Sequence, residues 1–254
     1  MARKYDLICD LYFDTCAKVV ASSKNWEAFL RSACNNYKLR FDEQLLVFAQ
    51  RPDAIAVLPM KQENTANWNK TFGRWVNRGA KGIAVFDDTA GSTQSLKYYF
   101  DISDTHPSSF ARNVPMWEMQ PMYESHVIET LEHTYGTLED KSSLVSAVFS
   151  ASKNAVADNM EDYAQDLLYA VEDSFLSGLA DDMVISMYKQ TVANSMAYMI
   201  LTRLGVDAEI YFEDFDFENV VNFNTPETLN ALGFAAGNLT KQGLREIART
   251  IFSL

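Results

Sequence analysis

The chain has 254 residues, of which 48% are hydrophobic and 13% aromatic, enough to bury a core and too many for a disordered protein. No apolar run approaches the roughly 18 residues of a membrane span, and three aspartates near the N-terminus interrupt any signal-peptide core, so we expect a cytoplasmic protein. The net charge of −12 argues against general binding of phosphate backbones.

Helices and short strands are predicted to alternate in the first part of the chain. Apolar residues at helical spacing predict helices over 5–20, 25–37 and 42–50. Short apolar or aromatic runs predict strands over 54–58, 83–86 and 97–102, of which the last two form a hairpin. Residues 103–121 are rich in Ser, Pro and Asp, and we expect a domain boundary there.

Helices dominate the prediction for the rest of the chain. Apolar stripes predict them over 122–135, 144–176 and 183–204. A last helix starts with Thr225 as N-cap and Pro226 at its first position, and Gly237 and Gly243 are expected to divide it into two pieces. We predict an α+β fold, with a small sheet and helices in residues 1–105 and an all-helical domain in residues 106–254.

The stretch 68–86 combines aromatic residues, cations and glycines. It is predicted to form a short helix, a glycine turn and a buried strand. On the helix, the cations fall on one stripe, which consists of Lys70, Arg74 and Arg78. The aromatic residues fall on another stripe, which consists of Trp68, Phe72 and Trp75. In the turn, Gly79 and Gly82 flank Ala80 and Lys81. The glycines can adopt a positive φ at little free-energy cost, and the backbone there can approach a ligand closely.

Two interpretations of this stretch are open. Cations that follow a phosphate backbone beside aromatic rings that stack on bases are typical of single-strand binding. In the other interpretation, the aromatic residues belong to the core and the cations form a solvated helix face. The pattern by itself favours the second interpretation.

Charge is spread unevenly along the chain. Residues 1–105 hold 14 Lys and Arg against 12 Asp and Glu, whereas residues 106–254 hold 8 against 22. Solvated helix faces would explain the acidic part, and so would a surface that mimics a polyanion. Acidic and aromatic residues mix most densely over 207–221, which predicts a protein interface with Glu209, Tyr211, Glu213 and Asp216 as its candidate residues.

No catalytic motif is present in the sequence. It contains no GxSxG, Walker-type or GxGxxG pattern. His126, Glu129 and His133 would share one helix face, but no further ligand completes a metal site. The cysteines lack CxxC spacing and are expected to be reduced thiols. We therefore expect a protein that is not an enzyme, with no catalytic residue, no metal and no cofactor.

Three ordered motifs resemble a known domain. They are FDEQLLVFAQRPDAIAV (41–57), W-x6-W-V-x-R-G-x-K-G-I-x-V (68–85) and YFDISDT (99–105). Together they resemble the N-terminal domain of large multi-domain proteins of conjugative elements and phages, where it precedes helicase or methyltransferase modules. Its RGxKGIxV core is also similar to the single-stranded-DNA-binding domain of ArdC-type antirestriction proteins. The segments SFLSGL (174–179), YFEDFDF (211–217) and FNTPETLNALG (223–233) extend the resemblance.

The resemblance implies an anti-defence role in a mobile genetic element. It assigns nucleic-acid binding to Arg78, Lys81 and the turn at Gly79 and Gly82. The sequence has neither the HExxH motif of the ArdC protease domain nor a helicase or methyltransferase module. We therefore expect a non-enzymatic protein that binds single-stranded DNA. The alternatives are an acidic inhibitor that blocks the nucleic-acid channel of a defence nuclease, such as a CRISPR effector or a restriction enzyme, and a scaffold that recruits partners.

Overall fold

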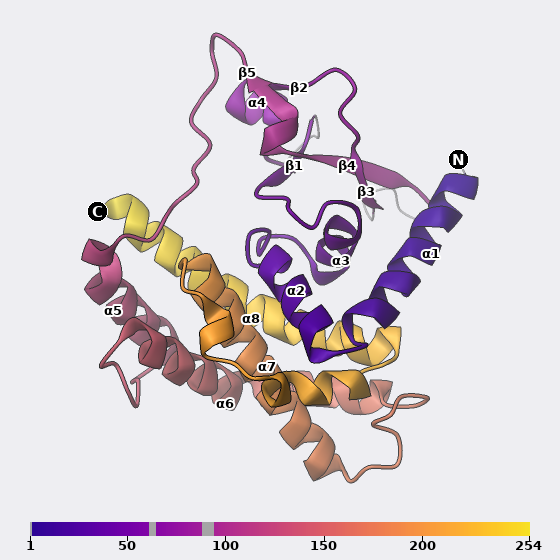
Figure 1. Cartoon of the computed structure of the whole chain (residues 1–254), viewed down its shortest axis with the longest axis vertical. Coiled ribbons are helices and arrows are strands. Elements are labelled where there is room, and N and C mark those ends of the chain that lie inside the picture. The colour runs from indigo at the N-terminus through magenta and orange to yellow at the C-terminus, as the bar shows by residue number, and fades with distance from the viewer. Residues whose placement is uncertain (1, 61–64, 88–93) are drawn as a thin grey trace.

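The computed structural model describes residues 2–60, 65–87 and 94–254 (Figure 1). Helices alternate with short strands up to residue 107, and only helices follow. The elements of the first part are α1 (Ala2–Val19), α2 (Ser23–Ala33), α3 (Phe41–Gln50), β1 (Val57–Pro59), α4 (Trp68–Phe72), β2 (Arg74–Val76), β3 (Ile83–Phe86), β4 (Leu96–Asp101), η2 (Ile102–Asp104) and β5 (Thr105–Pro107). Those of the second part are η3 (Pro121–Tyr123), α5 (Glu124–Tyr135), α6 (Leu144–Ala170), α7 (Asp181–Arg203), η4 (Ala208–Ile210), η5 (Asp214–Asn222) and α8 (Pro226–Ser253). The α+β prediction is confirmed.

In the described part of the chain, the strands form two small antiparallel sheets. One has the order β1-β4-β3, and its β3–β4 pair, with Ile83 opposite Tyr99 and Phe86 opposite Leu96, confirms the predicted hairpin. The other consists of β2 and β5 alone, which we call the β2–β5 ribbon. Neither strand of the ribbon was predicted. In Figure 1 both sheets lie above the layer of helices.

Side-chain caps begin several of the helices, and the last of them starts at the predicted N-cap, Thr225. The Ser22 hydroxyl accepts a hydrogen bond from the Asn25 N–H at 3.2 Å, and the Thr225 hydroxyl accepts one from the Thr228 N–H at 3.2 Å. After its cap, α8 continues as one helix of 28 residues. The prediction of two pieces is wrong. Gly233 and Gly243 receive side chains from other elements, and α8 also continues through Gly237, where a Cβ would come no closer than 4.0 Å to another group. A Cβ on Gly243, for example, would lie 2.5 Å from the Tyr135 hydroxyl.

Helices from both parts of the chain share one hydrophobic core. The core cluster includes Trp26 and Leu45 from the first part and Leu201 and Leu232 from the second. The buried Trp26 indole donates a hydrogen bond to the Ser195 hydroxyl of α7 at 2.9 Å. Helices α1 to α3 therefore lie against the predicted second domain, and the three-stranded sheet rests on α3 through β3.

A buried polar cluster attaches the larger sheet to α3. The Lys97 ammonium of β4 lies 2.7 Å from the Glu43 carboxylate of α3, and the Tyr99 hydroxyl donates to the same carboxylate at 2.9 Å. Burial opposes ionisation of Glu43, but the hydrogen bonds from Lys97 and from the Arg40 N–H outweigh it and lower the pKa of Glu43. Burial also opposes the charge of Lys97, and its contact with Glu43 nevertheless raises the pKa of Lys97.

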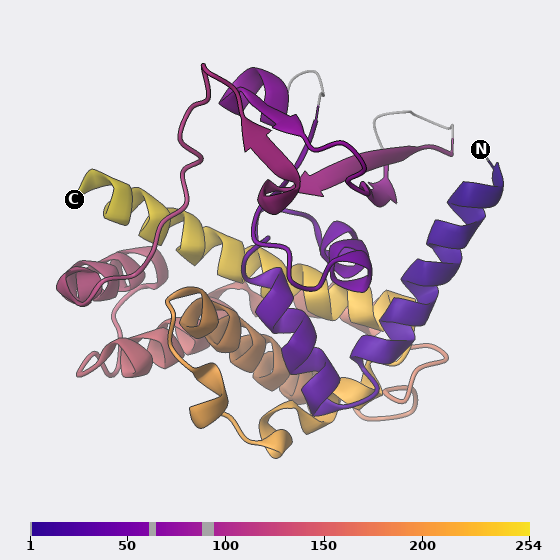
Figure 2. The ribbon, with the colours of Figure 1, turned by 45° about the horizontal axis from the view of Figure 1, so that its top comes forward.

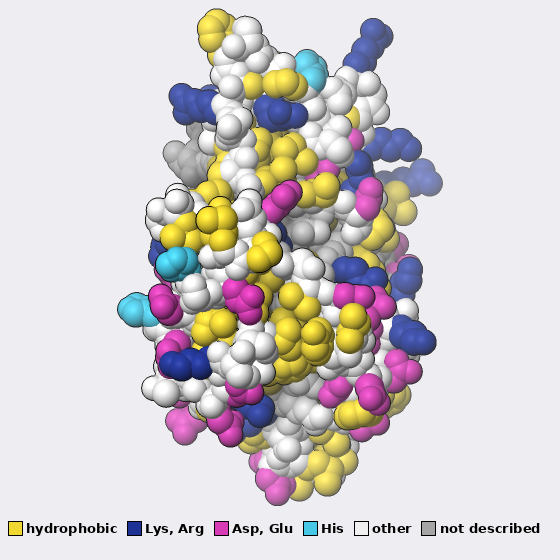
Figure 3. Space-filling model, turned by 60° about the vertical axis from the view of Figure 1, so that its left-hand side comes forward, with side chains coloured by type: hydrophobic (Ala, Val, Ile, Leu, Met, Phe, Trp, Pro, Cys, Tyr) yellow, Lys and Arg dark blue, Asp and Glu magenta, His cyan; other side chains and the backbone are white. Residues whose placement is uncertain are grey.

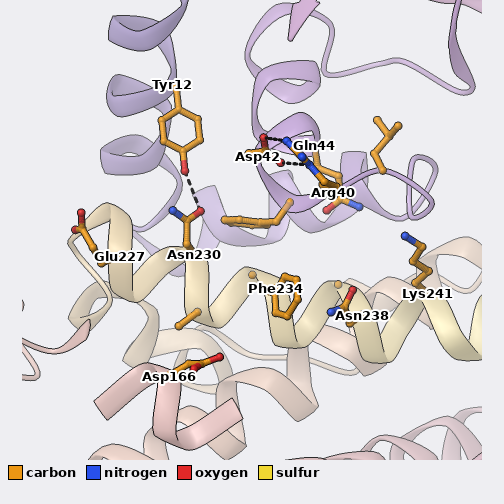
Figure 4. Close-up of a pocket in the computed structure, with 15 residues that line it drawn as sticks. Tyr12, Arg40, Asp42, Gln44, Asp166, Glu227, Asn230, Phe234, Asn238 and Lys241 are labelled. Carbon is orange, nitrogen blue, oxygen red and sulfur yellow. Dashed lines mark hydrogen bonds and ion pairs between the residues drawn. The ribbon is translucent and has the colours of Figure 1, made fainter. Parts of the chain in front are cut away.

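A cavity of about 560 Å³ opens between α8, α1 and the start of α3 (Figure 4). On one side the Tyr12 hydroxyl donates to the Asn230 side chain at 2.8 Å. On the other, the Arg40 guanidinium contacts the Asp42 carboxylate at 2.6 Å. Gly233 lies on the floor of the cavity, where the absence of a side chain lets the Phe41 ring approach α8.

One extended segment connects the ribbon with the helices. We call residues 108–120 the strap, since they contain no helix or strand. In Figures 1 and 2 the strap runs down one side of the molecule from β5 to α5. The strap lies within the predicted boundary, residues 103–121.

Candidate nucleic-acid interface

Helix α4 is shorter than the helix predicted from the cation and aromatic stripes. The Asn67 side chain caps it by accepting a hydrogen bond from the Lys70 N–H at 2.8 Å. Gly73 ends it after five residues with a left-handed φ of 61°. Arg74 then starts strand β2 and Arg78 lies in the following turn, so the predicted helical stripe of three cations does not exist.

Replacement of Gly73 by alanine is expected to lower the free energy of unfolding by about 2 kcal/mol, because the residue needs a positive φ and lacks space. A Cβ there would lie 3.0 Å from the carbonyl oxygen of Phe110. Gly79 is a matched control, since its φ is 89° but a Cβ would meet nothing within 4 Å. Urea unfolding should show a smaller loss for Gly79→Ala than for Gly73→Ala. An equal or larger loss for Gly79→Ala would contradict the role of the Phe110 contact.

Trp68 is a core residue. Its side chain is fully buried, and the indole donates a hydrogen bond to the Phe100 carbonyl at 2.7 Å. The Phe72 ring packs against it at a centroid distance of 5.8 Å. The interpretation in which Trp68 stacks on a base is therefore wrong, because the whole side chain is buried.

Trp75 has the opposite environment. It lies in β2 opposite His106 of β5, and 46% of its surface is exposed. Arg74, on the other face of the strand, donates two hydrogen bonds to Thr105, to the hydroxyl at 2.7 Å and to the carbonyl at 3.1 Å. The ribbon therefore fixes Arg74 and leaves Trp75 available for contact with a ligand.

The predicted glycine turn is present, and its two glycines have different roles. The Ala80 N–H donates to the Asn77 carbonyl at 3.1 Å, which closes a turn with Gly79 at its positive-φ position. Gly82 instead lies against β4, where a Cβ would be 3.1 Å from the Tyr98 and Phe100 side chains. The close approach expected at Gly82 is thus to the sheet. Arg78 and Lys81, which flank Gly79 in the turn, are both exposed.

Two residues of the strap add to this surface, and the sequence analysis missed both. Phe110 is 87% exposed, and Arg112 is exposed as well. The Arg112 N–H donates to the Phe72 carbonyl at 2.9 Å, and the Ser108 N–H to the Gly73 carbonyl at 3.0 Å. These backbone hydrogen bonds hold the start of the strap beside α4. The signal that could have found them is the sequence SSFAR, a cation close to an aromatic residue after a proline.

Lys and Arg, without Asp or Glu, supply the charged side chains of the segments that carry these residues. Residues 65–82 and 105–114 contain five cations and no Asp or Glu: Lys70, Arg74, Arg78, Lys81 and Arg112. We call these two segments, with the exposed rings of Trp75 and Phe110, the basic surface. Its four exposed cations have no ion-pair partner in the described part of the chain. Figure 3 shows Lys and Arg with few Asp and Glu in the upper part of the molecule, whereas most Asp and Glu lie in the middle and lower parts, together with further Lys and Arg.

The acidic segment 207–221 is partly built into the core. Phe212 and Phe217 are buried, and the Asp216 carboxylate accepts a hydrogen bond from the Glu213 N–H at 2.9 Å. Asp216 is therefore a capping residue. Glu209, which forms an ion pair with Arg31, is exposed. Tyr211 and Glu213 are exposed too, as are Ile210 and Phe215, which the sequence analysis did not select.

The described residues contain no group of three or more His, Cys, Asp and Glu that could hold a metal ion. His126 lies 4.0 Å from Glu129 on an exposed face of α5.

Within the described residues, no helix is both long enough and apolar enough to cross a membrane. Cys16 and Cys34 are free and buried, and burial raises the pKa of Cys16 to about 11 and that of Cys34 to about 12.

Comparisons with family models, with curated proteins and with solved structures find no match for this chain. The resemblance to mobile-element proteins rests on the motifs quoted above. Functional inference therefore depends on the geometry and charge of the two surfaces.

Proposed function

We propose that the protein binds single-stranded DNA through the basic surface. The observation that carries the proposal is the local charge: five cations without a carboxylate, in a protein whose net charge is −12. Exposed cations can follow a phosphate backbone, while Trp75 and Phe110 offer exposed rings on which bases can stack. Together with the motif resemblance, this favours an anti-defence protein that covers displaced or transferred single strands.

Fluorescence anisotropy with a labelled 20-nucleotide oligo(dT) tests the proposal. If the four exposed cations each contact one phosphate, the affinity should fall roughly 50-fold between 50 and 200 mM salt. Alanine at Trp75 or at Phe110 should weaken binding by about 1–3 kcal/mol each, because one stacking partner is lost. The absence of binding at low micromolar protein and 50 mM salt would refute the proposal.

A charge-matched pair of variants separates specific contacts from net charge. Replacement of Arg78, Lys81 and Arg112 by glutamine should abolish most binding and reduce the logarithmic salt slope by about 2. The control replaces three lysines that are exposed on helices, Lys18, Lys153 and Lys189, by glutamine and changes the net charge by the same amount as the first variant. This control should bind like the wild-type protein. Equal losses in both variants would show that the basic surface is not the site.

The acidic segment supports a second candidate function, inhibition of a defence nuclease. Ile210, Tyr211 and Phe215 are 73%, 46% and 57% exposed among the carboxylates of this segment, and exposed apolar anchors within a charged rim are typical of protein interfaces. Replacement of Glu209 and Glu213 by lysine should abolish inhibition of a nuclease target and leave DNA binding unchanged. Asp216 is unsuitable for this test because it caps η5.

A further inference from the structure

A second cavity, of about 350 Å³, lies where the strap passes between the sheets and the helices. Its volume falls within the range of small-molecule sites. β1, α4 and the strap supply its apolar walls, which include Ile55, Leu58, Trp68, Phe72, Met116 and Trp117. The walls are therefore suited to a flat apolar body.

One cation enters this apolar environment without an acidic partner. Arg203, the last residue of α7, lines the cavity and is half-buried. Its guanidinium lies 3.7 Å from the centre of the Trp117 ring and donates one hydrogen bond, of 2.9 Å, to the Trp117 carbonyl. No carboxylate of the described residues lies within ion-pair distance of it. Since a guanidinium has five N–H donors, Arg203 retains donors for a ligand.

Two further cations lie near Arg203, together with one carboxylate, that of Glu118. Lys38 lines the same cavity, and Arg245 of α8 is close enough to act on it electrostatically. Partial burial, with the charges of Arg245 and Arg203, lowers the pKa of Lys38. Burial likewise lowers the pKa of Arg203. Glu118 contributes the only carboxylate among the described residues that line the cavity. Both cations are therefore held where a bound anion would stabilise their charged forms.

We propose that this cavity binds a small organic anion with a planar aromatic body, whose anionic group contacts Arg203 and Lys38. The aromatic body would lie against the apolar walls, while the anionic group would take up the free donors of the guanidinium. A planar guanidinium that can donate two parallel hydrogen bonds recognises a carboxylate or phosphate oxygen pair well. The inference is independent of DNA binding, because Arg203 and Lys38 are outside the basic surface.

Calorimetric titration with 2-naphthoate tests the proposal, with 2-naphthylmethanol as the uncharged probe of the same shape. The wild-type protein should bind naphthoate at least tenfold more tightly than the alcohol. Arg203→Gln should remove that preference and leave binding of the alcohol unchanged. Glu118→Gln should strengthen naphthoate binding, because it removes the competing carboxylate, and it changes only an exposed side chain.

Two controls make the test decisive. Arg245→Gln removes an equal charge from outside the cavity lining and should weaken naphthoate binding less than threefold. The glutamine variant at Arg78, Lys81 and Arg112 should bind naphthoate like the wild-type protein. Equal binding of the two probes by the wild-type protein, or the same loss for both probes in Arg203→Gln, would overturn the proposal. If Arg203→Gln is unfolded by circular dichroism, an unchanged affinity of Glu118→Gln would overturn it instead.

Discussion

Replacement of Gly233 by alanine is expected to lower the free energy of unfolding by about 2 kcal/mol, because overpacking costs more than the gain in helix propensity. A Cβ at this position of α8 would fall inside the van der Waals surface of the Phe41 ring. The ring cannot retreat easily, since it is buried and packs edge-to-face on Phe29 with a centroid distance of 5.6 Å. The measurement is urea unfolding followed by circular dichroism.

The same helix supplies the control. Gly237 lies one turn further along α8, and the nearest atom to a Cβ there is the Gln44 side-chain oxygen at 4.0 Å. Gly237→Ala should therefore raise stability by about 0.5–1 kcal/mol. Phe41→Leu combined with Gly233→Ala should lose less stability than the two single changes added together, because the smaller side chain makes room for the methyl group. Additive losses would contradict the proposed clash.

Replacement of Glu43 by glutamine is expected to cost about 3 kcal/mol, since it leaves the charge of Lys97 buried without its partner. The Lys97 side chain is only 18% exposed and that of Glu43 only 6%. Tyr99, whose hydroxyl also donates to Glu43, loses a charged acceptor in the same variant. The double variant Glu43→Leu, Lys97→Met should be more stable than Glu43→Gln alone, because it removes both charges together.

The pH dependence of stability provides a second measurement of the same cluster. The pKa of Glu43 is lower in the folded protein than its ordinary value of 4.5, so its ionised form stabilises the fold. This contribution is fully present above about pH 4.5 and is lost as the pH falls through the lower folded-state value. Wild-type stability should therefore decrease more steeply below pH 4.5 than that of Glu43→Gln. Parallel pH profiles would contradict the lowered pKa.

The sequence predicted those parts of the fold that depend on neighbouring residues. Thr225 caps its helix through a hydrogen bond with Thr228, three residues away, and the β3–β4 hairpin joins two nearby strands. The β2–β5 ribbon was missed because its strands are about thirty residues apart in the chain, and three-residue strands have too little periodicity to be recognised. The continuity of α8 was missed for a similar reason, since Gly233 and Gly243 lie against Phe41 and Tyr135, which are distant in the sequence.

The candidate site was predicted in part. Arg78, Lys81 and the turn at Gly79 were selected through the motif resemblance, while the residue pattern alone predicted only the turn. An aromatic residue at helical spacing, by contrast, can face the core or the solvent. This is why the sequence could not separate Trp68, which is buried, from Trp75, which is exposed. Phe110 and Arg112 join the surface through backbone hydrogen bonds of the strap, from the Ser108 N–H to Gly73 and from the Arg112 N–H to Phe72 of α4, which no local sequence pattern predicts.

The separation of charge between the sheets and the helices makes the molecule a large electric dipole. Residues 106–254 hold 22 acidic and 8 basic side chains, while α4, β2 and β5, which belong to the segments of the basic surface, lie at the opposite end of the molecule from α6 and α7 (Figure 1). In the field of a polyanion such a dipole experiences a torque, which turns the sheets toward the polyanion before contact. Because the Debye length is about 10 Å at 0.1 M salt, this orientation is strongest in dilute buffer. It should appear as an association rate that falls with ionic strength more steeply than the dissociation rate rises.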